Sequence, residues 1–170
     1  AVLPKSLLNT GDESGQVRKK HMGSFAEGRS IIAIVPGAAR GPSKMWPADS
    51  FVKVAKMLIE KYSYGVLVMG GESDQDVCMR VTEALGKDAL CRAGRTSLRD
   101  SAVLFSDCST VICNDSGGMH LSAAVGTPVV AIYGITDPTK TGPMGDGHKL
   151  IMAEGVERNR DLDRDSPEAI

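Results

Sequence analysis

The residues with the clearest chemical potential lie in the stretch DSGGMHLSAAVG, which separates two apolar runs. Gly117 and Gly118 are expected to open a helix, whose first-turn backbone N–H groups form an anion site that glycine leaves open to close approach. Ser116 adds a hydroxyl and His120 a ring nitrogen to that turn, so both are candidates to donate to phosphate oxygens. Asp115 would repel phosphate, and it suits sugar hydroxyls or a helix cap.

Two other loops place polar groups beside glycines. The loop PGAARGPSKMWP contains Lys44, whose ammonium suits phosphate, but it lacks the Walker pattern because no GK[ST] opens the following helix. Trp46 of the same loop is expected to pack the loop onto the domain. The loop GGESD contains Glu72, and an acid after a strand can accept hydrogen bonds from a ribose diol.

Each of these groups also has a structural interpretation, which the residues alone leave open. Lys44 would then be a solvated lysine, and Glu72 a favourable negative charge at a helix N-terminus. Asp115 or Ser116 would be an ordinary helix cap, with His120 packed or solvated. Taken together, the three loops favour a nucleotide diphosphate as the ligand. The sequence shows no carboxylate cluster for a divalent ion, so neither a metal nor a resident cofactor is expected.

Apolar strands alternate with helical patterns along the chain and would position these loops. Continuous apolar runs predict strands at residues 31–35, 65–71, 89–94, 109–115 and 127–134, with a sixth candidate at 148–154. Helical spacing predicts helices at about 51–62, 73–85, 97–108 and 117–126. This alternation indicates an α/β fold with a doubly wound, mostly parallel sheet covered on both faces. The three loops leave the carboxyl ends of strands, so they are expected on one rim.

The composition fits one ordinary globular domain. The chain has 170 residues, of which 42% are hydrophobic and 24% charged, and its net charge of −1 gives no electrostatic footprint for nucleic acid. No apolar run reaches the roughly 18 residues of a membrane span, and the N-terminus lacks a signal-peptide core, so the cytoplasm is the expected compartment. Four cysteines without a CxxC pair are expected to be buried, reduced thiols rather than two disulfides: Cys78, Cys91, Cys108 and Cys113.

Residues 1–29 differ from the rest of the chain. They are polar, mixed in charge and without sustained periodicity, which predicts a linker or tail. Within them, HMGS at residues 21–24 resembles the scar that a cloning vector leaves, and both a native and an engineered origin stay open. His21 is therefore given no functional role, and residues 30–170 are taken as the folded domain.

Four segments together resemble a known family. PGAARGPSKMWP, GGESD, NDSGGMHLSAA and YGITDPTKTGP, in that order and at these spacings, resemble the carboxyl-terminal half of ADP-heptose:lipopolysaccharide heptosyltransferases, glycosyltransferase family 9. The resemblance runs from about Ile31 to Leu150. It implies the Rossmann-like, donor-binding half of a GT-B enzyme that transfers heptose from ADP-heptose to a lipid-linked core acceptor, with inversion and without a metal. A peripheral position at the inner membrane stays open.

The resemblance implies donor-binding roles for several residues. Those implied at the diphosphate are Lys44, Ser116, Gly117, Gly118 and His120. Those implied at the ribose and the transferred sugar are Glu72 and Asp115, and those that support the rim are Thr136 and Asp137. One departure is that KMWP, which begins at Lys44, stands where the family commonly has K-R-W-P, so a positive charge near the donor is absent.

The family's amino-terminal acceptor domain, which holds its catalytic base, is not in this chain. No catalytic residue is therefore expected here, and the chain alone is expected to bind the donor without transferring sugar. Two other functions stay open. One is a stand-alone nucleotide-sugar-binding module, and the other is a GT-B transferase that uses a UDP- or GDP-sugar.

Overall fold

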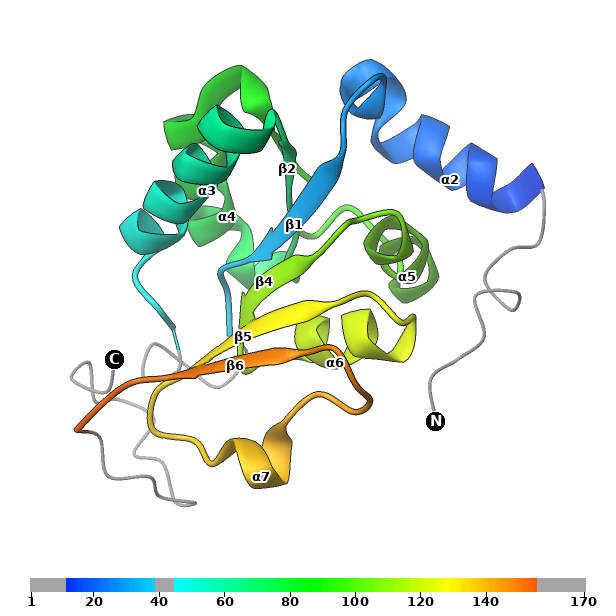
Figure 1. Cartoon of the computed structure of the whole chain (residues 1–170). Coiled ribbons are helices and arrows are strands. Elements are labelled where there is room, and N and C mark those ends of the chain that lie inside the picture. Colours follow the sequence, from blue (N-terminus) through cyan, green and yellow to red (C-terminus); the bar gives the residue numbers. More distant parts are fainter. Residues whose placement is uncertain (1–11, 39–44, 156–170) are drawn as a thin grey trace.

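Parallel strands form one sheet in the order β3-β2-β1-β4-β5-β6 in the computed structural model, which describes residues 12–38 and 45–155 (Figure 1). Along the chain the strands are β1 (Ile31–Val35), β2 (Gly65–Val68), β3 (Ala89–Cys91), β4 (Val111–Asn114), β5 (Val129–Tyr133) and β6 (Lys149–Met152). The predicted doubly wound parallel sheet is confirmed, including its sixth strand. The order reverses between β1 and β4, and in such sheets the ligand crevice lies outside the carboxyl ends of the strands at this switch point.

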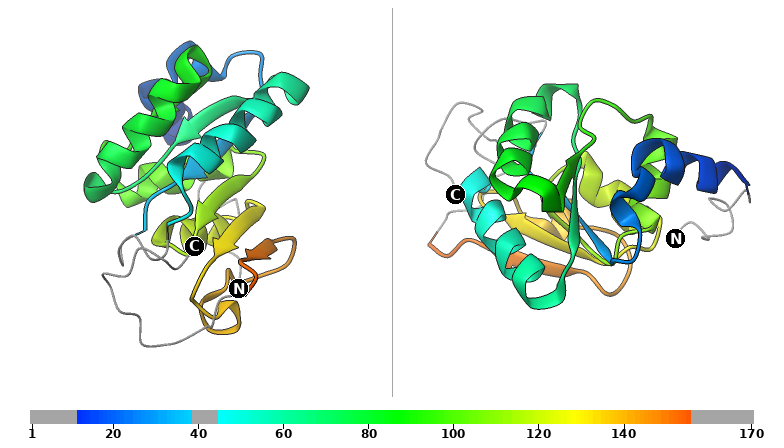
Figure 2. Two further views of the ribbon diagram at one scale, coloured as in Figure 1. Left: turned by 90° about the vertical axis from the view of Figure 1, so that its left-hand side faces the viewer. Right: turned by 90° about the horizontal axis from the view of Figure 1, so that it is seen from above.

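The helices lie in two layers, one on each face of the sheet (Figure 2). One layer contains α3 (Ala48–Tyr62) and α4 (Gln75–Leu85), and the other contains α2 (Asp12–His21), α5 (Leu98–Ser106) and α6 (Gly117–Ala124). Shorter turns are η1 (Gly23–Ala26), η3 (Glu72–Asp74), η4 (Gly86–Asp88) and α7 (Pro138–Thr141). From β1 the chain moves through β2 to β3 at one edge of the sheet, and from β4 it moves through β5 to β6 at the other edge. Because both sets of crossovers are right-handed, the connecting helices α3 and α4 lie on one face and α6 lies on the other. No helix in the described ranges has the length and apolar character needed to cross a membrane.

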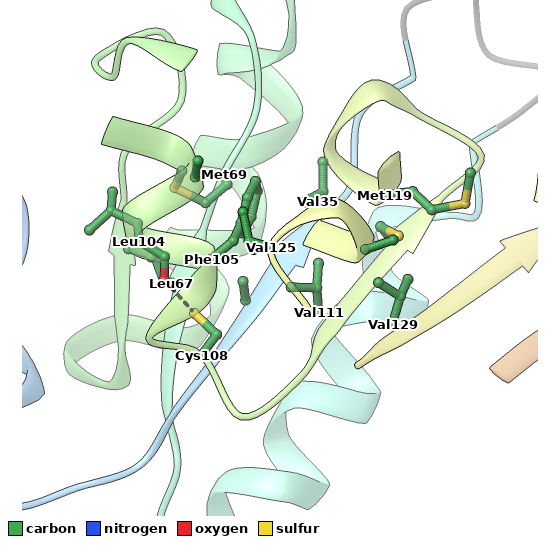
Figure 3. Packing of buried hydrophobic residues seen from close by; sticks show 14 of the residues in the cluster. Val35, Leu67, Met69, Leu104, Phe105, Cys108, Val111, Met119, Val125 and Val129 are labelled. Atoms are coloured by element: carbon green, nitrogen blue, oxygen red, sulfur yellow. Dashed lines mark hydrogen bonds between the residues drawn. The ribbon is translucent and has the colours of Figure 1, made fainter. Parts of the chain in front are cut away.

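Alternate residues of each strand face the two helical layers, because successive side chains of a strand point to opposite faces. In β1, Ile32 and Ile34 pack with Phe51 of α3, whereas Ala33 and Val35 belong to the core against α5 and α6. Figure 3 shows this second core, in which side chains from the strands meet those of α5 and α6. Each large side chain that is fully buried contributes about 1.5–3 kcal/mol to folding.

Residues 12–26 are not the linker or tail that the sequence predicts, because they form α2 and η1 and pack on the domain. Met22 is 6% exposed and belongs to the core on the α5 side. His21 is 4% exposed, and its Nε2 lies 2.9 Å from Asp100 Oδ2. The backbone carbonyl of His21 accepts a hydrogen bond from Arg92 Nε at 2.5 Å. This segment is therefore an integral part of the fold.

Charged contacts hold α2 against α5. Arg18 forms a two-bond ion pair with Asp107, and Arg99 pairs with Glu13. The hydrogen bond to Asp107 raises the pKa of the Arg18 guanidinium. Charged side chains make these contacts, so α2 lacks the apolar periodicity by which a sequence indicates a packed helix, and the sequence did not predict it. The vector origin considered for residues 21–24 stays a prediction.

All four cysteines are free thiols, as predicted, and Cys78, Cys108 and Cys113 are buried. Burial raises the pKa of Cys78 to about 12, and it also raises the pKa of Cys108 and of Cys113. The three thiols therefore stay protonated at neutral pH and pack as small apolar groups. Cys91 is only partly buried.

Candidate functional site

A hollow of about 570 Å³ opens at the carboxyl edge of the sheet, beside the switch point between β1 and β4. Its walls are the segments that follow β1, β2 and β3, the side of α5 that faces them, and the first turn of α6. The three loops singled out in the sequence all contribute to it, through residues 37–38, 70–74 and 116–118. The parallel sheet thus brings them to one rim.

The first turn of α6 forms one wall and contains the buried side-chain oxygen of Ser116. Ser116 is the N-cap residue of α6, yet its Oγ makes no hydrogen bond within the described residues. A buried donor left unpaired costs about 1–3 kcal/mol. A Cβ at Gly117 would meet nothing within 4 Å, whereas one at Gly118 would lie 3.1 Å from Val35 Cγ1. The helix therefore begins close to β1, with an open N-terminus that suits an anion able to pair with Ser116.

The segment after β2 forms a second wall, and the Asp74 side chain stabilises it. Asp74 Oδ2 accepts a hydrogen bond from Gly71 N at 2.9 Å. The Asp74 side chain also lies against Gly37, where an added Cβ would overlap the carboxyl group and come within 2.7 Å of Asp74 Cβ. Glycine at position 37 is thus required by this close approach. Glu72 is exposed and lines the hollow, so an acid stands where a sugar diol can donate to it.

The remaining wall is more apolar and includes Met69, Phe105 and Leu121. Two hydroxyls stand in the same wall, because Thr96 Oγ1 and Ser101 Oγ lie 2.8 Å apart. An anion site in one wall and an apolar surface with hydroxyls in another suit a ligand that combines a phosphate with a ring system. Within the described ranges, His, Cys, Asp and Glu nowhere gather in a group of three or more that could hold a metal ion.

Several of the predicted site residues lie outside the lining of the hollow. Asp115 is 8% exposed, and its Oδ2 accepts a hydrogen bond from Thr141 Oγ1 at 3.4 Å. Thr136 is buried, and His120 is exposed on α6. Lys44 lies outside the described residues. The donor contacts predicted for Asp115, His120 and Lys44 stay predictions, and so does the supporting role predicted for Thr136.

Asp137, also predicted at this rim, caps α7. Its Oδ1 accepts hydrogen bonds from Thr139 N at 3.0 Å and Thr139 Oγ1 at 2.7 Å. The bond from the Thr139 hydroxyl holds the pKa of the Asp137 carboxyl below its usual range. Tyr133 Oη donates to the carbonyl of Thr141 at 3.0 Å, and burial raises the pKa of Tyr133. These bonds attach α7 to β5 and bring Thr141 beside Asp115.

Sequence reasoning missed several residues that build this rim. Asn114 ends β4 and is 0% exposed, and a polar residue that closes an apolar strand was the signal that could have identified it. Gly37 and Asp74 meet only because β1 and β2 are neighbours, so nothing local pairs them. No local sequence signal places Thr96 and Ser101 in the wall of the hollow either.

Comparison with known proteins gives a consistent result. Residues 5–169 match the family model described as glycosyltransferase family 9 (heptosyltransferase). Lipooligosaccharide heptosyltransferase 2 of Haemophilus influenzae is 39% identical over 132 residues, which are 75% of this chain and 38% of that protein. Lipopolysaccharide heptosyltransferase 2 of Escherichia coli is 36% identical over 132 residues, again 75% and 38% of the two chains. The chain thus spans about two fifths of the length of these curated relatives.

Solved structures match the same fold. The structure of E. coli ADP-heptose LPS heptosyltransferase II has a TM-score of 0.78 and 29% identity, with 93% of this chain and 48% of that chain covered. The structure of the glycosyl transferase family 9 from Veillonella parvula has a TM-score of 0.72 and 27% identity, with 83% and 40% covered.

Proposed function

The chain belongs to glycosyltransferase family 9, and from that premise we propose that it is the donor-binding part of a heptosyltransferase of lipopolysaccharide core synthesis. The proposed donor is ADP-heptose, and the acceptor is a lipid-linked core sugar held by a further domain that also supplies the catalytic base. Support comes from relatives named heptosyltransferase at 36–39% identity and from the hollow beside α6. The proposed compartment is the cytoplasm.

The observation that carries this proposal is the buried Oγ of Ser116 at the first turn of α6, which finds no hydrogen-bond partner in residues 12–38 and 45–155. A diphosphate oxygen at this point accepts a hydrogen bond from Ser116 and from the first-turn N–H groups, so it satisfies a buried donor that has no partner among the residues the structure describes. These donors are fixed in place before the reaction. They therefore also stabilise the negative charge that develops on the diphosphate as the bond to heptose breaks.

The rest of the hollow suits the nucleoside and the sugar. Glu72 accepts hydrogen bonds from the ribose hydroxyls, and the wall that contains Phe105 and Leu121 packs against the base. By motif, Lys44 adds a cation at the diphosphate, and Asp115 contacts the heptose. Thr136 and Asp137 support this edge of the rim.

The proposed reaction is a direct displacement that inverts the anomeric carbon. The acceptor hydroxyl attacks from the face opposite ADP, the bond from that carbon to the phosphate oxygen breaks, and ADP leaves with the electron pair. The proton of the acceptor passes to the base of the further domain. The negative charge on the departing ADP is stabilised, in place of a metal, by the α6 dipole and by Ser116, Lys44 and His120.

Nucleotide titration tests the donor site. Trp46 is a suitable reporter because its ring packs edge-on against Phe51, with centroids 5.1 Å apart, close to the rim. We expect ADP to change the fluorescence of Trp46 saturably and to bind more tightly than UDP or GDP by calorimetry, with and without EDTA. Tighter binding of UDP or GDP would indicate a different sugar donor. No binding of any nucleotide by the folded chain would contradict a donor site.

Transfer itself is tested in a two-domain protein. We expect this chain, joined to the amino-terminal half of a family 9 heptosyltransferase, to transfer heptose from ADP-heptose in the presence of EDTA, with inversion detected by NMR of the product. If the chain binds ADP but no family 9 acceptor half yields transfer, the stand-alone nucleotide-sugar-binding module would be the better description.

A further inference from the structure

The side chain of Asn114 joins the two ends of the loop that leaves β1. Asn114 is 0% exposed, its Nδ2 donates to the carbonyl of Pro36 at 2.7 Å, and its Oδ1 accepts from the backbone N–H of Trp46 at 2.9 Å. Pro36 directly follows β1, and Trp46 lies two residues before α3. One carboxamide therefore fixes the chain on both sides of residues 39–44, for which the structure gives no description.

These two bonds begin where the backbone pairing of β1 and β4 stops. The last aligned pair of the two strands is Val35 with Cys113, so the next pair in register would be Pro36 with Asn114. Asn114 itself is aligned with Ile132 of β5. Its side chain thus continues the link between β4 and β1 by one residue, at the point where the sheet opens for a ligand.

The fixed end of β1 is also a wall of the hollow. Gly37 follows Pro36 and lies against the Asp74 side chain, which in turn accepts the hydrogen bond from Gly71. A continuous row of contacts therefore runs from Asn114 through the end of β1 to the loop after β2, in the order of the strands β4, β1 and β2. Movement of the Pro36 carbonyl away from Asn114 would move this wall.

We propose that Asn114 is a positioning residue of the nucleotide-sugar site. Its carboxamide holds the Pro36–Ala38 wall at the separation from Ser116 that a diphosphate needs, while Asn114 itself touches no ligand. This inference rests on the proposed function for the identity of the ligand, but the two hydrogen bonds exist without it. The required group is a side chain with one donor and one acceptor, and Asn supplies both where Asp supplies only acceptors when ionised.

Two substitutions separate the two bonds. Asn114→Ala removes both, whereas Asn114→Asp keeps an acceptor for Trp46 N and replaces the donor to Pro36 by an oxygen. We expect the dissociation constant of ADP to rise at least roughly tenfold in both variants, measured on folded protein. In hydrogen-exchange NMR, the Trp46 amide should lose protection in Asn114→Ala and keep it in Asn114→Asp.

The matched control is Thr110→Val, because Thr110 Oγ1 donates to the carbonyl of Pro128 at 3.1 Å beyond the opposite end of β4. It should lower stability without changing ADP affinity by more than about twofold. ADP affinities within twofold of wild type in both folded Asn114 variants would overturn the positioning role, whatever their stability.

Two further outcomes are also decisive. If neither Asn114 variant folds, the ligand-free wild-type chain decides, because rapid exchange of both the Trp46 amide and the Asn114 side-chain amide would overturn the proposal. If wild-type protein does not bind ADP, the proposed function fails together with the role in donor binding. The exchange data would then still report whether the two hydrogen bonds of the Asn114 side chain form.

Discussion

The rim of the sheet and the contact between α2 and α5 are both hollowed and polar, but they differ in how their polar groups are paired. A hollow of about 410 Å³ lies between α2 and α5. Between the same helices Arg18 pairs with Asp107, while His21 and Lys20 both contact Asp100. At the rim, the buried hydroxyl of Ser116 has no partner among the described residues. Polar groups that are satisfied within the fold hold elements together, whereas a buried donor without a partner indicates a place for a ligand.

The largest effect that distinguishes the two regions is expected from glycine substitutions. Gly37→Ala places a Cβ against the Asp74 side chain, so we expect a loss of about 1–3 kcal/mol in the free energy of unfolding and at least a roughly tenfold loss of ADP affinity. Gly15→Ala in α2 meets no atom within 4 Å, so it should stabilise the protein by about 0.5–1 kcal/mol and leave ADP binding unchanged. Urea unfolding and calorimetry measure both quantities. If both substitutions changed ADP affinity to the same extent, the distinction between the rim and the α2–α5 contact would be wrong.

A smaller effect, with opposite signs for folding and binding, is expected at Ser116. Ser116 makes no side-chain cap bond, so Ser116→Ala should raise the free energy of unfolding by about 1 kcal/mol while it lowers ADP affinity about tenfold. The control is Ser106→Ala, because Ser106 Oγ donates to the carbonyl of Val103 at 2.7 Å. That variant should lose stability and keep its ADP affinity. A loss of stability in Ser116→Ala would show that its hydroxyl is paired after all.

The smallest effect concerns the pH dependence of the α2 contact. The hydrogen bond from His21, followed by contacts of Lys20 and Ser97, holds the pKa of Asp100 below its usual range. The folded pKa lies below the unfolded value of about 3.9, so this stabilisation is complete above that value and is lost as the pH falls through the folded pKa. The difference in unfolding free energy between wild type and Asp100→Asn should therefore shrink below about pH 4.

The matched control for this measurement is Asp76→Asn, which changes an exposed acid in the first turn of α4. Its difference from wild type should vary less over the same pH range. A difference between wild type and Asp100→Asn that stays constant down to pH 2 would contradict the role of the His21 contact. Neither substitution should alter ADP affinity by more than about twofold.

The sequence predicted the sheet well because its central strands β2, β1 and β4 are buried on both faces. Runs such as IIAIV and GVLVMGG have no polar face, which is typical of parallel strands between two helical layers, and the alternation with helices fixed the fold class. The sixth strand was also correct, although β6 is exposed along its length. The free cysteines followed from their scattered positions in apolar segments.

The sequence failed where contacts join distant segments by charge or by a single polar side chain. α2 was taken as a linker because its partners, Asp100 and Asp107, lie 79 and 89 residues away in the chain. Asn114 was given no role of its own from the sequence, because its link to Pro36 and Trp46 depends on the pairing of β4 with β1.

The sequence by itself thus determined the fold class, the family resemblance and the rim on which the polar loops meet, because periodicity and local motifs are encoded within a few neighbouring residues. Only the tertiary structure decided which polar groups find partners. Within the described part of the chain, the hydroxyl of Ser116 has no partner and the carboxamide of Asn114 has two, although the two residues are only two positions apart. The physical reason is that a hydrogen bond requires its donor and acceptor within about 3 Å, and the strand order sets that distance.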